Sequence, residues 1–335
     1  LEKKVLVQDQ SSYYLYEQIY QDKTVFRGLM GLVTVQDFLD GKIKKHESTL
    51  TERKEKLAHY LDKVNIQAEP VLLTYNSNPK VEMLMNHEEK NIPVLNYTAE
   101  NGTRHKVWRI DNRLKMQQLK EVLDQIESFY IADGHHRIGS TALNAELHKE
   151  RNKKHMGTEP YNFVFAYIVS KESIKIHDYN RLLKDLNGMS EEEFMKKLED
   201  SFVIHQKGTE PYFPSKKFHF SMYIGGKFYS LHVKHEIRKA EHERDQDFDH
   251  LLLEKLIFND IIGIDNCKVT DKLKYVKGNS TMQSILEMKE MVDSGNYKAA
   301  FGIYPVSFND LIRISDKNIV MPPKCTLIEP KLMTA

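Results

Sequence analysis

The pattern of apolar and polar residues predicts a chain in which short strands alternate with amphipathic helices. Two runs rich in aromatic and β-branched residues, 13–20 and 25–35, flank four polar residues, which is the pattern of a β-hairpin. A second hairpin is expected at Asn101-Gly102, a dipeptide that favours a type I′ turn. Apolar residues three or four positions apart indicate helices. Helices are expected to begin near residues 52, 116, 138 and 191, and two more are expected over 248–258 and 282–292. Further strands are expected at 70–75, 106–110, 129–132, 163–169 and 299–304. A third hairpin is expected at Gly225-Gly226.

The polar segment 153–160, which contains Gly157 and Pro160, is the best candidate for a domain boundary. A chain of 335 residues is long enough for two domains. We therefore expect a first domain over residues 1–158 and a C-terminal α/β domain over residues 159–335. The mixture of hairpins and crossover helices predicts the α+β class.

Charge and composition exclude several classes of protein. Lys and Arg number 49 against 48 Asp and Glu, and the net charge of +1 provides no overall field for attracting nucleic acid or an anionic membrane. No run of eighteen apolar residues predicts a membrane span. Cys267 and Cys325 form no metal or redox motif, so we expect a cytoplasmic protein. The chain starts at Leu1 without the plan of a signal peptide, and we expect that a native N-terminal segment is missing.

The most informative stretch is the strand, turn and helix with the sequence Ile-Ala-Asp-Gly-His-His-Arg. A helix N-terminus presents unpaired backbone N–H groups and the positive end of the helix dipole, so it readily binds a phosphate. Gly134 would let the backbone approach the anion, and Arg137 could bind two of its oxygens. His135 and His136 could donate further hydrogen bonds.

Asp133 is an acid placed beside this expected anion site. It would make sense as a ligand for a substrate ammonium group or for a magnesium-bound water. The alternative is that Asp133 caps the helix and that the two histidines are incidental, but the combination of five such residues favours function. A zinc site is not expected, because adjacent histidines point apart and no further ligands stand at metal spacing.

A second candidate is the pair His46-Glu47, which precedes the helix expected near residue 52. Thr49 stands at capping-box spacing from Glu52. Taken alone, a His-Glu pair in a loop is usually solvated surface.

The motif Ala132-Asp133-Gly134-His135-His136-Arg137 resembles a widespread prokaryotic family catalogued as a domain of unknown function, number ten-fifteen. Members of that family usually carry a further N-terminal segment. The resemblance covers nearly the whole chain and includes His46-Glu47-x-Thr49, Pro70-Val71-Leu72, Lys106-Val107-Trp108-Arg109, Tyr179 to Gly188, Met321 to Thr326 and Pro330-Lys331-Leu332.

That family in turn looks like the free serine kinases of the ParB/sulfiredoxin-like fold. Those enzymes carry a His-Glu pair ahead of a helix, a strand led by proline, and an Asp-Gly-His-His-Arg type of turn. The resemblance implies that Glu47 is the catalytic base, that His46, Asp133 and His136 belong to the catalytic site, and that the turn up to Arg137 holds nucleotide phosphate. It also implies a ParB/sulfiredoxin-like core, here with an inserted hairpin and a second α/β domain that the short kinases do not share.

Three functions follow from these residues. The first is phosphoryl transfer from ATP or ADP to a small hydroxy-amino acid, with free serine as the leading acceptor and Mg²⁺ held through the phosphates. A phosphohistidine intermediate on His135 or His136 stays open. The second is a ParB-like nucleotide-binding switch, although no basic helix-turn-helix for a DNA partner is evident. The third is a nucleotide or phosphoester hydrolase. A homodimer is possible, and no nucleic-acid or membrane partner is expected.

Three residues outside the motif have two readings each. Arg181 could reach the nucleotide phosphates or pair with an acid such as Asp185. Lys324, which follows two prolines, could close over the bound nucleotide or be a solvated surface residue. Trp108, the single tryptophan, is expected to pack in a core or at a domain interface.

Overall fold

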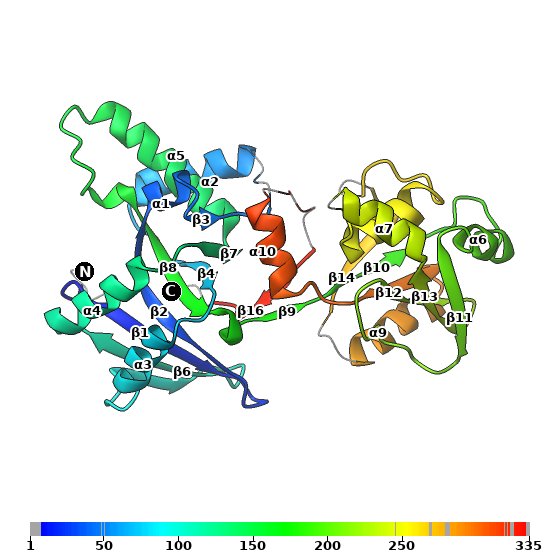
Figure 1. The fold of residues 1–335 in the computed structure, drawn as a ribbon, viewed down its shortest axis with the longest axis horizontal. Helices are drawn as coiled ribbons and strands as arrows, with labels where there is room; N and C mark the ends of the chain where they lie inside the picture. Colours follow the sequence, from blue (N-terminus) through cyan, green and yellow to red (C-terminus); the bar gives the residue numbers. More distant parts are fainter. Residues whose placement is uncertain are drawn as a thin grey trace. The chain divides into compact units, whose positions relative to one another are not determined.

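A computed structural model describes residues 8–47, 49, 51–244, 246–267, 270–278, 282–317, 319, 321 and 325–332 (Figure 1). The chain forms two compact units. Unit 1 comprises Leu1–Lys175, Ile314–Val320 and Ile328–Ala335, and unit 2 comprises Ile176–Arg313 and Met321–Leu327.

The expected boundary after residue 158 falls inside unit 1. The reason is strand β8 (Phe163–Ser170), which lies between β4 and β2 in the unit 1 sheet and hydrogen bonds to both. The polar segment 153–160 is therefore a loop within unit 1, at the end of a helix. The expected α+β class is confirmed, because both units combine a mixed or antiparallel sheet with helices.

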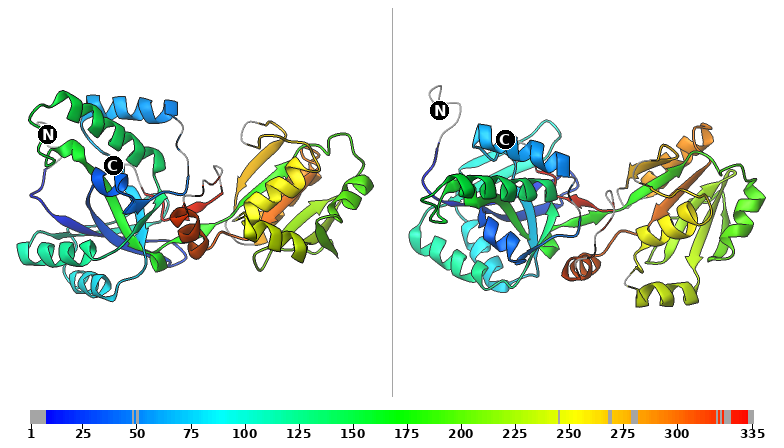
Figure 2. Two further views of the ribbon diagram at one scale, coloured as in Figure 1. Left: turned by 45° about the horizontal axis from the view of Figure 1, so that its top comes forward. Right: turned by 90° about the horizontal axis from the view of Figure 1, so that it is seen from above.

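Unit 1 is built on an eight-stranded sheet with the order β3-β7-β4-β8-β2-β1-β6-β5. Its other strands are β1 (Tyr13–Ile19), β2 (Val25–Thr34), β3 (Ile43–Lys44), β4 (Val71–Tyr75), β5 (Leu95–Thr98), β6 (Arg104–Ile110) and β7 (Phe129–Asp133). Its helices are α1 (Val35–Leu39), α2 (Thr51–Val64), α3 (Pro79–Glu88), α4 (Arg113–Asp124) and α5 (His135–Arg151), with 3₁₀ turns at Pro160–Asn162 and Lys171–Ser173. Helices α2 and α5 lie side by side (Figures 1 and 2).

The first expected hairpin is confirmed, with β1 antiparallel to β2. The second hairpin joins β5 to β6, but its turn is not of type I′. Gly102 has a φ of 78°, whereas Asn101 is not among the residues with positive φ. The Gly102 amide donates to Ala99 O at 2.9 Å, and the Ala99 amide donates to Thr103 O at 2.9 Å. This is the three-residue hairpin in which a type I turn is followed by a left-handed glycine.

One face of the unit 1 sheet packs against helices to form a single apolar core. Trp108 lies in this core with 3% of its surface exposed, and its indole N–H donates to Asn91 O at 2.9 Å. The expectation of a core role for Trp108 is confirmed. The fluorescence of this single tryptophan will therefore report on the unfolding of unit 1.

Unit 2 is built on a six-stranded sheet with the order β11-β13-β12-β15-β10-β14. Its strands are β10 (Tyr179–Leu183), β11 (Phe202–Gly208), β12 (His219–Ile224), β13 (Lys227–Val233), β14 (Leu273–Lys277) and β15 (Ala299–Ile303). Its helices are α6 (Glu191–Leu198), α7 (His235–Glu243), α8 (Asp249–Leu253), which continues as a π-helix (Glu254–Asn259), and α9 (Met282–Asp293). Helix α10 (Phe308–Asp316) begins in unit 2, and β9 (Lys175–His177) pairs with β16 (Leu327–Glu329) in a two-stranded sheet.

The pairings described within the unit 2 sheet are antiparallel, rather than the parallel strands typical of an α/β domain. Successive residues of a strand face opposite sides of a sheet, and β10 shows this clearly. Leu183 belongs to the core that packs against α6, α8 and the π-helix. Leu182 belongs to the smaller core that packs against α9. The unit 2 sheet is therefore covered by helices on both faces (Figure 1).

Within the described residues, no helix combines the length and the apolar composition that crossing a membrane requires.

Candidate active site

Three segments that are distant in sequence meet at one edge of the unit 1 sheet. Strand β3 runs parallel to β7, with Ile43 opposite Phe129, so the residues that follow both strands leave at the same edge. Strand β4 runs antiparallel to β7, with Leu72 opposite Asp133, so the residues before β4 also lie at this edge. This edge therefore gathers the residues after β3, before β4 and after β7.

The turn after β7 leads directly into α5. Gly134 is the N-cap residue with φ 99° and ψ 27°, a left-handed conformation that favours glycine. The amides of His135, His136 and Arg137 have no hydrogen-bond acceptor in the described part of the chain. A 17-residue helix thus presents three free N–H donors and the positive end of its dipole at this edge.

Asp133 does not cap α5, because its carboxylate contacts side chains instead. Oδ2 accepts a hydrogen bond from Arg137 Nη2 at 2.9 Å, and Oδ1 lies 3.5 Å from Lys331 Nζ. Arg137 Nη1 forms an ion pair with Glu69, which precedes β4. Arg137 is therefore held between two carboxylates, and a phosphate bound at the turn would compete with them for its guanidinium group.

The Arg137 side chain also passes close to Gly134, so a side chain at this position would have to displace it. A Cβ atom placed on Gly134 would lie 2.8 Å from Arg137 Nε, closer than a side-chain contact allows. Gly157 provides a matched comparison, since its φ is 87° and a Cβ atom there would meet nothing within 4 Å.

We expect Gly134→Ala to reduce the free energy of unfolding of unit 1 by more than Gly157→Ala does. Both variants place alanine in the left-handed region, at a cost of about 1–2 kcal/mol, but only Gly134→Ala must also displace Arg137 from Asp133. Urea unfolding followed by Trp108 fluorescence measures both losses. Equal losses in the two variants would show that the close approach of Arg137 contributes nothing.

Glu47 lies at the same edge as the turn, next to the first histidine of α5. Glu47 Oε2 is 3.8 Å from His135 Nδ1. The backbone N–H of His46 donates to His135 Nε2 at 3.4 Å, and the two rings meet edge to face with centroids 4.4 Å apart. Because Nε2 accepts this hydrogen bond, the proton of a neutral His135 lies on Nδ1, facing Glu47. His135 Nδ1 is therefore a donor on the side of Glu47, although 3.8 Å is too long for a hydrogen bond.

Both of these histidines are neutral at neutral pH. Burial lowers the pKa of His46 to about 4. Burial also lowers the pKa of His135 well below its usual range, and the nearby His46 and His136 lower it further. His136 is less buried; burial and the positive charge of Arg53 lower its pKa as well. Its Nδ1 atom is buried and has no hydrogen-bond partner among the described residues.

Sequence reasoning missed two residues of this site. Glu69 pairs with Arg137, and Lys331 approaches Asp133 from near the end of the described chain. Neither residue stands in a motif with the turn. The only available signals were the position of Glu69 directly before the Pro70 strand and the presence of Lys331 in the resemblance noted above.

The described contacts of this site include neither of the other two predicted residues. Arg181 lies on β10 in unit 2 and is fully buried. Its expected alternative partner Asp185 instead lies 3.7 Å from Lys272 Nζ. Lys324 lies outside the described residues. Among the described residues, no group of three His, Cys, Asp or Glu side chains is arranged to hold a metal ion.

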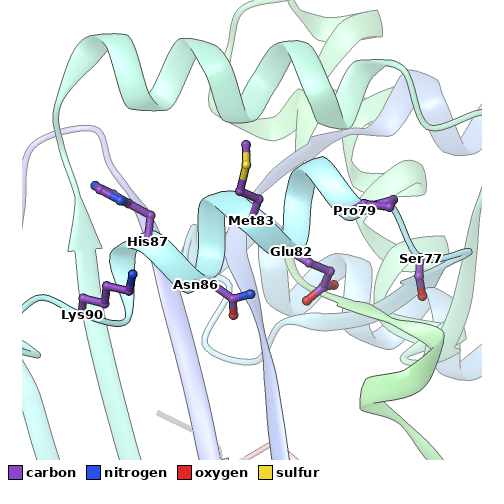
Figure 3. Close-up of a pocket in the computed structure, with 7 residues that line it drawn as sticks. All are labelled: Ser77, Pro79, Glu82, Met83, Asn86, His87 and Lys90. Carbon is purple, nitrogen blue, oxygen red and sulfur yellow. The ribbon is translucent and has the colours of Figure 1, made fainter.

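A surface pocket of about 630 Å³ lies at the opposite edge of the sheet. It is lined by Ser77 and by residues along α3, with Glu82 and Asn86 pointing away from Met83 and His87 (Figure 3). Ser77 follows the C-terminal end of β4, whereas the β7 turn lies beside the start of β4. This pocket is therefore separate from the Glu47 and Asp133 site.

Comparisons with known proteins identify a family. The family model described as "Protein of unknown function (DUF1015)" matches residues 1–256. No curated protein matches the chain.

Several solved structures resemble the chain at low identity. SbnI with C-terminal truncation from Staphylococcus aureus shares 11% identity with a TM-score of 0.45, covering 90% of this chain and 82% of that chain. A free serine kinase in complex with AMP shares 13% identity with a TM-score of 0.39, covering 90% and 87%. A conserved hypothetical protein from Pyrococcus furiosus shares 13% identity with a TM-score of 0.39, covering 90% of each chain. Because these TM-scores are below 0.5, we infer no function from the structural similarity.

Proposed function

Because the chain belongs to the protein family of unknown function DUF1015, its activity must be inferred from its own residues, and we propose that it is a nucleotide-dependent phosphotransferase. The acceptor that we propose is a small hydroxy-amino acid, with free L-serine giving O-phosphoserine. The observation that carries this proposal is a carboxylate, Glu47, beside a helix N-terminus with three free amides. A base next to an anion-binding turn is what transfer of a phosphoryl group to a hydroxyl requires.

Glu47 acts as the general base in this proposal. The serine hydroxyl oxygen attacks the terminal phosphorus of the nucleotide, and Glu47 takes the hydroxyl proton. The bond from that phosphorus to its bridging oxygen breaks, and the shortened nucleotide leaves. The Nδ1 proton of His135 would orient the carboxylate once the two atoms approach from 3.8 Å to hydrogen-bond distance.

The α5 turn holds the transferred phosphoryl group in this proposal. The amides of His135, His136 and Arg137 supply hydrogen bonds and the helix dipole supplies positive potential. In this proposal the substrate ammonium group replaces Lys331 as the cation beside Asp133. The Lys331 ammonium group is then available to bind phosphate oxygens. A phosphohistidine intermediate on His135 or His136 stays an alternative route.

Magnesium would be held mainly by the nucleotide phosphates. Asp133 is engaged by Arg137 and Lys331, and the described residues supply no set of three protein ligands. When bound, the ion would neutralise charge on the phosphates. The contributions of Arg181 and Lys324 to nucleotide binding, and the ParB/sulfiredoxin-like label for the unit 1 fold, stay predictions.

The test is to incubate the full chain with Mg²⁺ and either ATP or ADP, with L-serine, L-threonine or no acceptor, and to identify the products by mass spectrometry. We expect O-phosphoserine only when serine and one of the nucleotides are present together. Nucleotide turnover without an acceptor would replace the proposal with a hydrolase. Tight nucleotide binding without turnover in any mixture would replace it with a nucleotide-binding switch.

A further inference from the structure

Among the described residues, Arg181 is the largest fully buried side chain, with none of its surface exposed. It lies on β10, where its neighbours across the sheet are Tyr275 on β14 and Phe301 on β15. The guanidinium group lies over the Tyr275 ring, with its central carbon 4.9 Å from the ring centroid. These residues all belong to unit 2.

Among the described residues, no carboxylate forms an ion pair with this buried charge, although Glu254 lies near it, with Oε1 3.5 Å from the Tyr275 hydroxyl. Arg181 Nη1 donates to the backbone oxygen of Tyr179, whereas Nε and Nη2 have no hydrogen-bond partner in the described part of the chain. A guanidinium group cannot lose its proton at ordinary pH, so it stays charged when it is buried. A buried charge that is left unpaired is strongly unfavourable.

Arg313, another arginine of unit 2, provides a comparison because it has both an aromatic contact and an ion-pair partner. Arg313 lies over the Phe248 ring, with its central carbon 4.4 Å from the centroid, so it has the same kind of aromatic contact as Arg181. Its Nη2 atom, however, forms an ion pair with Asp247 at 2.5 Å. The contrast singles out Arg181 as a buried arginine with no described carboxylate at ion-pair distance.

The two unpartnered atoms of Arg181 have a defined geometry. Nε and Nη2 point from the same edge of the planar guanidinium group, and this edge can bind two oxygens of one carboxylate or phosphoryl group. The contacts with Tyr179 and Tyr275 fix the other edge and one face of the group. The donor pair is thus oriented before any ligand arrives.

We propose that unit 2 holds a second anion site, in which Arg181 binds a small oxyanion through Nε and Nη2. The ligand is a carboxylate or a phosphoryl group on a small molecule, because the guanidinium group is covered and can be reached only through a local opening. This site does not depend on the phosphotransferase proposal, since it uses no residue of the Glu47 and Asp133 site.

The test compares the wild-type full chain with Arg181→Met and with the matched control Arg313→Met. Each protein is measured in Tris chloride alone, with potassium phosphate, or with potassium acetate, at constant ionic strength adjusted with potassium chloride. Amide hydrogen exchange of peptides covering 179–183 and 273–277 localises any effect to unit 2, so an anion bound at the α5 turn does not interfere. Thermal unfolding gives the accompanying shift in Tm.

We expect an anion to slow amide exchange in both wild-type peptides. It should also raise Tm by about 2–4 °C at an anion concentration that leaves roughly five bound protein molecules for each free one. Arg181→Met should lose the exchange effect while its Tm without anion stays equal or rises, because an uncompensated charge is removed. Arg313→Met should have a lower Tm and keep the exchange effect.

An effect of phosphate alone identifies a phosphoryl ligand, and an effect of acetate alone identifies a carboxylate. No effect of either anion on the wild type would overturn the proposal, as would an undiminished effect in Arg181→Met. A fall in Tm for Arg181→Met as large as that for Arg313→Met would assign Arg181 a structural role instead. None of these readouts involves nucleotide turnover, so failure here is distinguishable from failure of the phosphotransferase proposal.

Discussion

Replacing Glu47 by glutamine is expected to lower the rate of phosphoryl transfer by about 10²–10⁴-fold, the usual contribution of a positioned general base. Glutamine has the same shape as glutamate and can still contact His135 Nδ1, but it cannot accept the hydroxyl proton. The helix amides that bind phosphate are unchanged by this substitution, so the affinity for nucleotide should be nearly the same. Steady-state turnover and nucleotide titration of the same preparation measure the two quantities separately.

The matched control is Glu52→Gln. Glu52 lies only five positions further along the chain, but it is exposed and forms an ion pair with Lys56 one helical turn away. This exposed pair is worth at most a few tenths of a kcal/mol, so turnover should stay at the wild-type level. If Glu47→Gln and Glu52→Gln were equally active, Glu47 would not be the base.

Unit 1 is expected to lose stability as the pH falls from about 6.5 to about 4. Burial lowers the pKa of folded His46 to about 4, whereas an unfolded histidine titrates near 6.5. The unfolded chain therefore binds the proton more readily than the folded chain, and acidification favours unfolding through this interval. The shift corresponds to about 3 kcal/mol from His46 alone, and His135, whose pKa is also lowered by burial, acts in the same direction.

Urea unfolding at several pH values, followed by Trp108 fluorescence, measures this loss for unit 1. His46→Phe removes the titrating group but keeps an aromatic ring against His135, so the decline in stability with falling pH should become shallower. His59→Phe, at an exposed position of α2, is the control and should keep the wild-type slope. An unchanged slope in His46→Phe would contradict this prediction, because it would show that burial does not lower the pKa of His46.

Local patterns predicted the larger elements of both units, but not the contacts that complete the site. The β1–β2 hairpin and the strand, turn and helix around Asp133 follow from apolar spacing and turn residues within short windows. Strand β3 has only two residues, too few to show any periodicity. Yet its parallel pairing with β7 is what brings Glu47 to the turn, so only the family resemblance could indicate that approach.

The domain boundary and the role of Arg181 were beyond local reasoning for a different reason. A polar loop such as 153–160 can lie within a domain as well as between domains, and only the pairing of β8 reveals to which unit it belongs. For Arg181, the sequence left nucleotide binding and pairing with Asp185 both open. Complete burial depends on how sheet and helices pack, which no window of sequence contains.

The division of the chain has a consequence for how the protein is made. Unit 2 is inserted into unit 1, whose last described segment, 328–332, includes the lysine that contacts Asp133. A ribosome therefore completes residues 1–175 and all of unit 2 before that lysine is synthesised. Until then, the nascent chain carries the α5 turn without Lys331. A product released early by premature termination would keep Glu47 and the turn, but it would leave one oxygen of Asp133 without its cation.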